Sequence, residues 1–221
     1  MSAFQPLIRD PYAIEAESFR IIDAELSPHF RFTPDEHAVV RRVVHASADF
    51  EYARNLRFHP GCFDAFRAAM ARQADIICDV QMVMAGVSKA KLSLFGGSLL
   101  CPIGDQDVAA AAKAAGHTRA MEAMRKMARR GPGGVLAIGN APTALTEAIR
   151  LVREEGWRPD LIIGMPVGFV SAAESKDSLA QGDAEPVPYI TTLGRKGGSA
   201  SVVSCVNALL LLAEGKDPVK G

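Results

Sequence analysis

A histidine and an arginine lie one helical turn apart in a pattern that suits proton transfer beside an anionic ligand. Arg42 and His45 both belong to the segment RRVVHASADF, and residues three apart in a helix point in similar directions. Histidine is the side chain that ordinarily gains and loses a proton near neutral pH, and an arginine can hold a carboxylate through two hydrogen bonds. His45 is therefore the candidate general acid and base, and the alternative is an ordinary surface histidine on an exposed helix face.

Three loops of small residues follow apolar runs that read as buried strands. They belong to VLAIGNAPTALTEAIRLV (135–152), GMPVGFVSAAESKDSL (164–179) and YITTLGRKGGSASVVSCVNALL (189–210). Each loop leads into a helical pattern, so the three strand ends are expected at one edge of a parallel sheet. Open α/β sheets bind their ligands at that edge.

Cations lie in or beside two of these loops. Arg195 and Lys196 precede the last helical pattern, and Lys176 begins the helix after GMPVGFV. Together with the N–H groups at helix starts, they predict binding of a carboxylate or a phosphate. The alternatives are that the glycines serve tight turns and close packing, and that Lys176 forms a surface ion pair with Glu174.

Several other kinds of site are not indicated. Neither GxxxxGK[ST] nor GxGxxG with its following acidic residue occurs after a strand, which disfavours a nucleotide- or flavin-dependent oxidoreductase. The histidines and the four cysteines show no chelating spacing, so no protein-bound metal is expected. The cysteines also lack a CxxC pair, which favours buried reduced thiols in a cytoplasmic protein. They are Cys62, Cys78, Cys101 and Cys205.

The composition sets the size of the fold and excludes some partners. The chain has 221 residues, of which 48% are hydrophobic, so it can bury one substantial core. We expect a single domain over residues 1–221. Lys plus Arg and Asp plus Glu number 25 each, which gives no overall attraction to nucleic acid or to an anionic membrane. No apolar stretch is long enough to span a bilayer, and the N-terminus lacks the pattern of a secretory leader.

The elements that must position these residues differ between the two parts of the chain. The first part, about 1–70, is predicted to be a helical segment that packs on the rest. Asp10 and Pro11 start a helix that ends near Leu26. Thr33-Pro34-Asp35-Glu36 combines a capping threonine with a glutamate three residues later, and it starts a helix that continues to about residue 49.

The second part, about 74–212, is predicted to be an α/β core. Five strands are expected near 76–81, 98–103, 135–138, 161–164 and 189–193. Helices are expected around 107–126, 143–154 and 199–212, and the connection over 87–97 is a short helix or a loop. Strands joined by crossover helices form a mostly parallel sheet that is covered on both faces.

The chain resembles the precorrin-8X methylmutase family of cobalamin biosynthesis, including its cobalt-precorrin-8 members, over nearly its whole length. The motifs that carry the resemblance are IRDPYAIEAESFRII (8–22), RRVVHASADF (41–50), AIGNAPTAL (137–145), GMPVGFVSAAESKDSL (164–179) and GRKGGSA (194–200). The fourth is specific, and the order and spacing of the others add to it. The resemblance implies a flavodoxin-like three-layer sandwich and a homodimer with its sites near the subunit interface.

The activity implied by this resemblance is an intramolecular isomerisation. A methyl group migrates from C-11 to C-12 of precorrin-8x or cobalt-precorrin-8, giving hydrogenobyrinate or cobyrinate, without a dissociable cofactor. The position of His45 matches the family's proton donor and acceptor, and Ser18 and Arg42 match positions that contact substrate. Such a ring carries several carboxylate arms, for which Arg42, Lys176, Arg195 and Lys196 are candidates. A carrier of the same fold that binds the corrin without catalysis is the alternative.

Overall fold

A six-stranded mixed sheet forms the centre of the molecule. The computed structural model describes residues 9–216, so the outermost residues of the predicted domain lie outside the described part. The strands are β1 (Leu56–Phe58), β2 (Ile76–Cys78), β3 (Leu99–Leu100), β4 (Val135–Ile138), β5 (Leu161–Gly164) and β6 (Tyr189–Thr192). Their order is β1-β6-β5-β4-β2-β3, in which β1 pairs antiparallel with β6 and the other neighbours are parallel.

The prediction of a five-stranded sheet was wrong by this edge strand. The segment expected to be helical supplies β1, which places Leu56 opposite Thr192 and Phe58 opposite Ile190. Three residues are too few to show an alternating pattern, and the pairing joins parts of the chain far apart in sequence. Counted from β2, the parallel strands have the order 2-1-3-4-5, which is the flavodoxin-like doubly wound order.

Helices cover both faces of this sheet. The N-terminal helices are α1 (Pro11–Leu26), α2 (Pro34–Ser47), α3 (Glu51–Asn55), α4 (Cys62–Ala71), α5 (Gln81–Gly86) and α6 (Lys89–Ser93). The later ones are the 3-10 turn η1 (Pro102–Gly104), α7 (Gln106–Ala115), α8 (Arg119–Arg130), α9 (Pro142–Glu155), α10 (Ala172–Ala180) and α11 (Ser199–Ala213).

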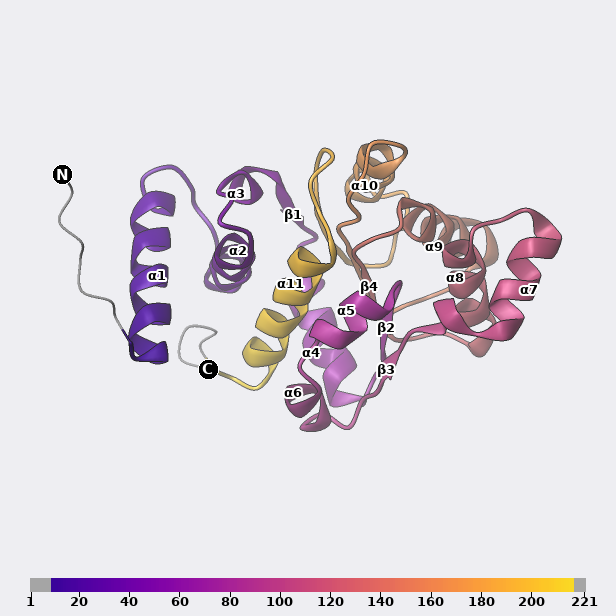
Figure 1. Ribbon diagram of the computed structural model, residues 1–221, viewed down its shortest axis with the longest axis horizontal. Coiled ribbons are helices and arrows are strands. Elements are labelled where there is room, and N and C mark those ends of the chain that lie inside the picture. The colour runs from indigo at the N-terminus through magenta and orange to yellow at the C-terminus, as the bar shows by residue number, and fades with distance from the viewer. Residues whose placement is uncertain (1–8, 217–221) are drawn as a thin grey trace.

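Two hydrophobic cores lie on opposite faces of the sheet. Alternate strand residues point to each face, so Ile76 and Ile163 join one core while Ile77 and Ile162 join the other. The first core lies under α4, α5 and α11, with α2 packed on α11 and α1 packed on α2 (Figure 1). The second lies under α8 and α9, with α7 beyond α8. The molecule therefore has three layers, with helices on each side of the sheet. The helices α1 and α2 add to the outside of one helix layer.

The start signals read from the sequence form the caps expected of them. The Asp10 carboxylate accepts a hydrogen bond from the Tyr12 N–H at 3.3 Å and begins α1. At the start of α2, the Thr33 hydroxyl accepts from the Glu36 N–H at 3.3 Å, and the Glu36 carboxylate accepts from the Thr33 N–H at 2.8 Å. These reciprocal bonds satisfy backbone donors that the first turn leaves unpaired, and they fix where α2 begins.

The helix predicted over 107–126 is two helices. Gly116 ends α7 in the left-handed region, with φ 67°, and the Thr118 hydroxyl caps α8 by accepting from the Met121 N–H at 3.2 Å. Glycine adopts this conformation without a steric penalty, so the chain turns between the two helices. The connection over 87–97, left open between a helix and a loop, contains α6, and α5 precedes it.

Candidate active site

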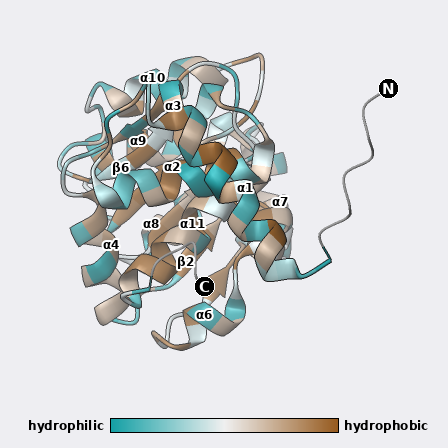
Figure 2. Cartoon of the chain, turned by 90° about the vertical axis from the view of Figure 1, so that its left-hand side faces the viewer, coloured by the Kyte–Doolittle hydropathy of each residue, from teal (hydrophilic) through white to brown (hydrophobic). Residues whose placement is uncertain are grey.

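His45 and Arg42 line a cavity of about 500 Å³ beside α11. Its walls come from α1, α2, the first turn of α6 with its cap, and one side of α11. The lining residues are Glu15, Arg42, His45, Ala46, Ser88, Lys91, Ala200, Val203, Ser204, Asn207 and Leu211. In Figure 2 the view is onto α1 and α2, and α6 lies below them. The cavity thus lies along the helix layer, and none of the strand-end cations Lys176, Arg195 and Lys196 lines it.

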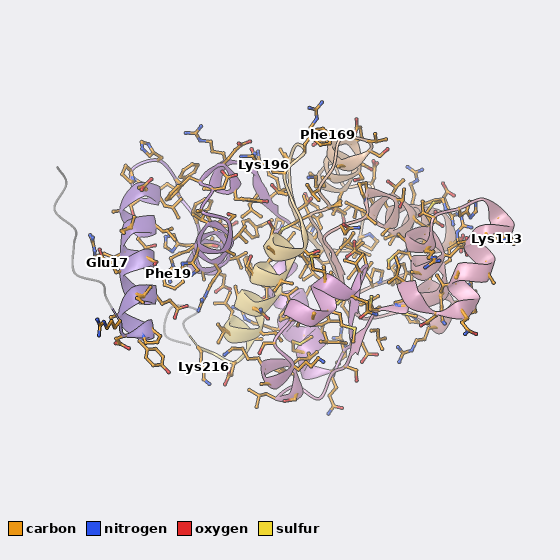
Figure 3. All side chains as sticks on the ribbon, viewed as in Figure 1. Glu17, Phe19, Lys113, Phe169, Lys196 and Lys216 are labelled. Atoms are coloured by element: carbon orange, nitrogen blue, oxygen red, sulfur yellow. The ribbon has the colours of Figure 1, made fainter. Side chains whose placement is uncertain are left out.

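The polar side of α2 packs against α1. The Arg42 guanidinium donates to the Glu15 carboxylate at 2.5 Å, and that of Arg41 donates to Asp23 at 2.9 Å. Both guanidinium carbons lie 4.9 Å from the centre of the Phe19 ring, which is buried between the two helices. Figure 3 shows Phe19 directed from α1 toward α2. Two ion pairs and one aromatic ring therefore hold α2 at a defined position and rotation against α1. This in turn sets the placement of His45.

His45 lies in the last turn of α2, just before Ala48 ends the helix in the left-handed region. Its ring centre is 4.9 Å from that of Phe19, and the planes are tilted by 35°. The phenyl ring supports the imidazole on one side, and the residue is otherwise exposed and lines the cavity. An imidazole held in this way can exchange a proton with a ligand in the cavity.

Ser18 lies on the same side of α1 as Glu15 and Phe19, because residues three and four apart share a helix face. Its hydroxyl donates to the Ile14 carbonyl at 2.8 Å, and the residue is half-buried. Ser18 is not among the residues that line the cavity of this single chain. The structure places it next to the wall formed by Glu15, and its contact with substrate stays a prediction.

The far wall of the cavity is made of residues that were not predicted from the sequence. Ser88 and Lys91 come from the connection whose structure was left open, and no motif drew attention to them. Ser204 and Asn207 lie three apart in the part of α11 after Ser201, where the other residues are apolar. That spacing was the available signal, because polar residues on one side of an apolar helix mark a side that does not face the core.

The glycine-rich loops are bonded to each other at the ends of β5 and β6. The Gly198 N–H donates to the Met165 carbonyl at 2.9 Å, and the Gly168 N–H donates to the Arg195 carbonyl at 3.2 Å. A Cβ at Gly197 would lie 2.2 Å from the Met165 carbonyl oxygen, so only glycine allows this approach. At these positions, the glycines bring the two backbones into close contact.

The three cations of these loops lie apart from the His45 cavity. Lys176 is fully buried and donates to the Lys196 carbonyl at 2.6 Å, and burial lowers its pKa to about 8. The Lys196 amine bonds Asp49 at 2.6 Å and Glu51 at 2.5 Å, and these carboxylates raise its pKa. Arg195 lies over the exposed Phe169 ring, 5.6 Å from its centre. Figure 3 shows Phe169 and Lys196 at the same end of the molecule.

A buried carboxylate fills the crevice where a doubly wound sheet usually binds its ligand. This crevice lies between β2 and β4, where the strand order reverses. Asp79 follows β2 and is fully buried. Its side chain accepts from the Gly139 N–H at 3.1 Å, from Asn140 at 2.7 Å and from Ala141 at 2.8 Å. Burial raises the pKa of Asp79, although the three backbone donors oppose that shift. In a nucleotide-binding protein of this topology such N–H groups would hold a phosphate. Here the Asp79 carboxylate already accepts from them, so the geometry argues against a nucleotide or flavin site.

The comparisons with known proteins decide the family. Residues 13–212 match the model of a protein family that is described as precorrin-8X methylmutase. The match covers the cavity, its helices and the whole sheet. The chain belongs to this family.

Individual relatives agree over nearly the full length. The cobalt-precorrin-8 methylmutase of Priestia megaterium is 47% identical over 211 residues, which are 96% of this chain and 92% of that protein. The precorrin-8X methylmutase of a Sinorhizobium species is 42% identical over 202 residues, covering 91% of this chain and 95% of that protein. The crystal structure of the precorrin-8x methylmutase from Thermus thermophilus has a TM-score of 0.82 and 42% identity, covering 92% of this chain and 98% of that one.

The family places the chain among the isomerases of cobalamin biosynthesis, as an intramolecular methylmutase. The resemblance inferred from the five motifs is confirmed. Nothing among the relatives supports a non-catalytic carrier. The relatives named cobalt-precorrin-8 methylmutase are 35–47% identical to this chain, and those named precorrin-8X methylmutase are 41–42% identical.

Another cavity is more acidic than the one beside His45 and so suits an anionic tetrapyrrole less well. A cavity of about 670 Å³ between α1 and α3 is lined by Glu25, Asp49 and Glu51, with Arg54 as its cation.

Residues 9–216 contain no group of three His, Cys, Asp or Glu side chains that could hold a metal ion. Within the same range, no helix is both long and apolar enough to cross a bilayer.

Proposed function

We propose that this methylmutase moves a methyl group from C-11 to C-12 of precorrin-8x or cobalt-precorrin-8, forming hydrogenobyrinate or cobyrinate, with His45 as proton donor and acceptor. The supporting observation is that His45 and Arg42 line one cavity in a chain that matches the family over residues 13–212. Residues supplied by α1, α6 and α11 surround them.

The chemistry requires a proton that is lent to the ring and then returned. Moving a methyl group between adjacent ring carbons redistributes charge through the conjugated system. The imidazolium of His45 protonates the ring, the methyl group migrates, and the proton returns to His45. Atoms and electrons balance within one molecule, so substrate and product have the same mass and the histidine ends in its starting state.

Arg42 and Ser18 contact the substrate from the side of the cavity that α1 and α2 form. Arg42 is half-buried at the cavity and already bonds Glu15 at 2.5 Å, and its remaining guanidinium donors suit a carboxylate arm. Ser18 lies beside Glu15 on α1. Lys176, Arg195 and Lys196 form a separate group at the strand ends, and their binding of further arms is tested by substituting each one singly.

The cavity of one chain is too small for the whole substrate. Cavities of about 300–1,000 Å³ bury most of a drug-sized ligand, whereas a corrin with its arms exceeds that size and this cavity measures about 500 Å³. Tyr12 and Ile14 of α1 expose large apolar side chains next to Glu15. We therefore include in the proposal a cytoplasmic homodimer whose second chain closes the site, and sedimentation of the purified protein tests it.

The decisive experiment compares His45→Ala with the wild type on metal-free and cobalt-containing substrate. Absorbance reports the changed conjugation, and mass spectrometry must show no change in mass. We expect the variant to lose about 10²–10⁴-fold in rate while it still binds the product. His29→Ala is the matched control, because His29 is exposed and does not line this cavity.

Each outcome of this experiment has a distinct meaning. An unchanged rate in His45→Ala would remove His45 from the mechanism. A wild-type protein that binds the corrin product tightly but isomerises neither ring would be a carrier. The ring that the wild type converts faster identifies the natural substrate.

A further inference from the structure

Lys91 is a cation of the His45 cavity, and its amine has no partner in the described part of the chain. Arg42, the other cation of the lining, is bound to Glu15 at 2.5 Å. No hydrogen bond or ion pair engages the Lys91 amine within residues 9–216, and the residue is half-buried. A lysine in this position can bind an anion that enters the cavity without first breaking an ion pair.

The segment that carries Lys91 is held against α11 by one amide side chain. The Asn207 Oδ1 atom accepts from the Ser88 N–H at 2.9 Å, and its Nδ2 atom donates to the Gly86 carbonyl at 3.1 Å. Ser88 in turn caps α6, since its hydroxyl accepts from the Lys91 N–H at 3.3 Å. A continuous set of hydrogen bonds therefore connects α11 to the backbone of Lys91.

Close packing sets the distance between this segment and α11. A Cβ at Gly86 would lie 2.7 Å from a methyl carbon of Val203, which itself lines the cavity. Glycine lets α5 approach α11 at this point, and the next residue, Val87, is buried in the core. Figure 1 shows α5 and α6 beside α11. The wall that bears Lys91 is thus a packed part of the fold.

We infer that Lys91 binds a peripheral carboxylate of the macrocycle and that Asn207 positions it for this contact. The inference rests on the proposed function. His45 acts on the conjugated ring from α2, whereas Lys91 comes from a different wall of the same cavity. One fixed cation at the edge of the ring restricts its rotation, and this selects which ring carbons face His45. Lys91 is therefore a substrate-binding residue, and Asn207 acts through it.

Substitution of Lys91 tests the contact with two probes, one with ionised carboxylate arms and one whose arms are neutral methyl esters. The probes are cobyrinic acid and its heptamethyl ester, titrated against the full-length protein by visible absorbance. We expect Lys91→Met to weaken binding of the acid about tenfold or more, to leave binding of the ester within about twofold, and to raise KM more than it lowers kcat. Lys91→Arg should restore most of the affinity for the acid.

Lys89→Met is the matched control, since Lys89 begins the same helix, is exposed and does not line the cavity. It should change neither affinity. Asn207→Ala should weaken acid binding several-fold in the wild type and add little in the Lys91→Met background, because the two residues act as one unit. Additive effects in that double variant would refute the positioning role.

The results separate this inference from the function on which it rests. If the wild type binds cobyrinic acid and Lys91→Met binds it equally well, the role of Lys91 is refuted and the methylmutase proposal stands. Equal losses for the acid and the ester would also refute it, because they would indicate a damaged fold. If the wild type binds no cobyrinic acid and isomerises neither ring, both proposals fail.

Discussion

The buried amine of Lys176 makes the stability of the fold depend on pH in a specific window. Its side chain is fully buried, and its amine bonds the Lys196 carbonyl at 2.6 Å. Burial lowers the pKa from 10.5 to about 8, while the neighbouring Asp177 opposes this shift. Between pH 8 and 10.5, therefore, the Lys176 amine is deprotonated in the folded state but still protonated in the unfolded chain.

The sign and size of the effect follow from this difference. Between pH 8 and 10.5 the unfolded chain binds one more proton at this site, so the free energy of unfolding rises with pH. Below pH 8 both states are protonated and the folded state carries the full cost of burying the charge. Each pKa unit corresponds to about 1.36 kcal/mol, which gives a gain of at most about 3 kcal/mol across the window.

Urea unfolding of the wild type and Lys176→Met between pH 7.5 and 10.5 measures this gain. Methionine fills a similar volume without a titrating group. The variant leaves the Lys196 carbonyl without its donor, which costs about 1–3 kcal/mol at every pH. Against that constant offset, the wild type should gain stability relative to the variant as pH rises. Lys113→Met, an exposed site on α7 (Figure 3), should keep the wild-type profile.

Other groups also titrate in this pH range, and their contributions to stability cancel when the variants are compared with the wild type. Burial raises the pKa of Cys62 and of Cys78 to about 12, so these thiols favour the folded state less as the unfolded thiols ionise at high pH. This contribution has the opposite sign and is shared by all three proteins. If the free energy of unfolding of the wild type, measured relative to that of Lys176→Met, stayed constant or fell from pH 8 to 10.5, the reasoning would be refuted.

Three further substitutions test local features of the fold. Thr33→Ala removes the cap of α2 and should lower the free energy of unfolding by about 1 kcal/mol in urea; an unchanged value would show that the capping box adds nothing. Gly197→Ala should lower the melting temperature strongly, because its Cβ would meet the Met165 carbonyl at 2.2 Å, while Gly104→Ala, with no atom within 4 Å, should not. Asp79→Ala leaves three N–H groups without their acceptor, so calorimetry should show a larger loss than for Thr33→Ala, and a smaller loss would contradict it.

Local signals predicted the helices well where a few neighbouring residues determine them. Asp10 and Thr33 began helices where expected, because a cap depends on side chains within three residues. The break at Gly116 was missed, since the alanine-rich pattern continues on both sides of it. The strand β1 was missed for a different reason: its pairing with β6 joins residues more than 100 positions apart, and no local pattern records that contact.

Two residues that line the cavity were singled out from the sequence for the same physical reason. Arg42 and His45 share a helix, so their spacing brought them to one cavity. Lys91 and Asn207 reach that cavity only through the packing of α6 and α11, which is a tertiary contact. The loops at the strand ends gave the strongest sequence signal, yet their glycines bring backbones together and Lys176 is turned into the fold.

The attachment of α1 has a consequence for how the enzyme loses activity. This helix carries Glu15 and Phe19 and packs chiefly on α2, away from the central sheet. Elements at the periphery open at lower free energy than buried strands. Warming should therefore detach this outer helix and halt turnover while the six strands remain folded. A compound that wedges beneath it would inhibit the methylmutase without denaturing it.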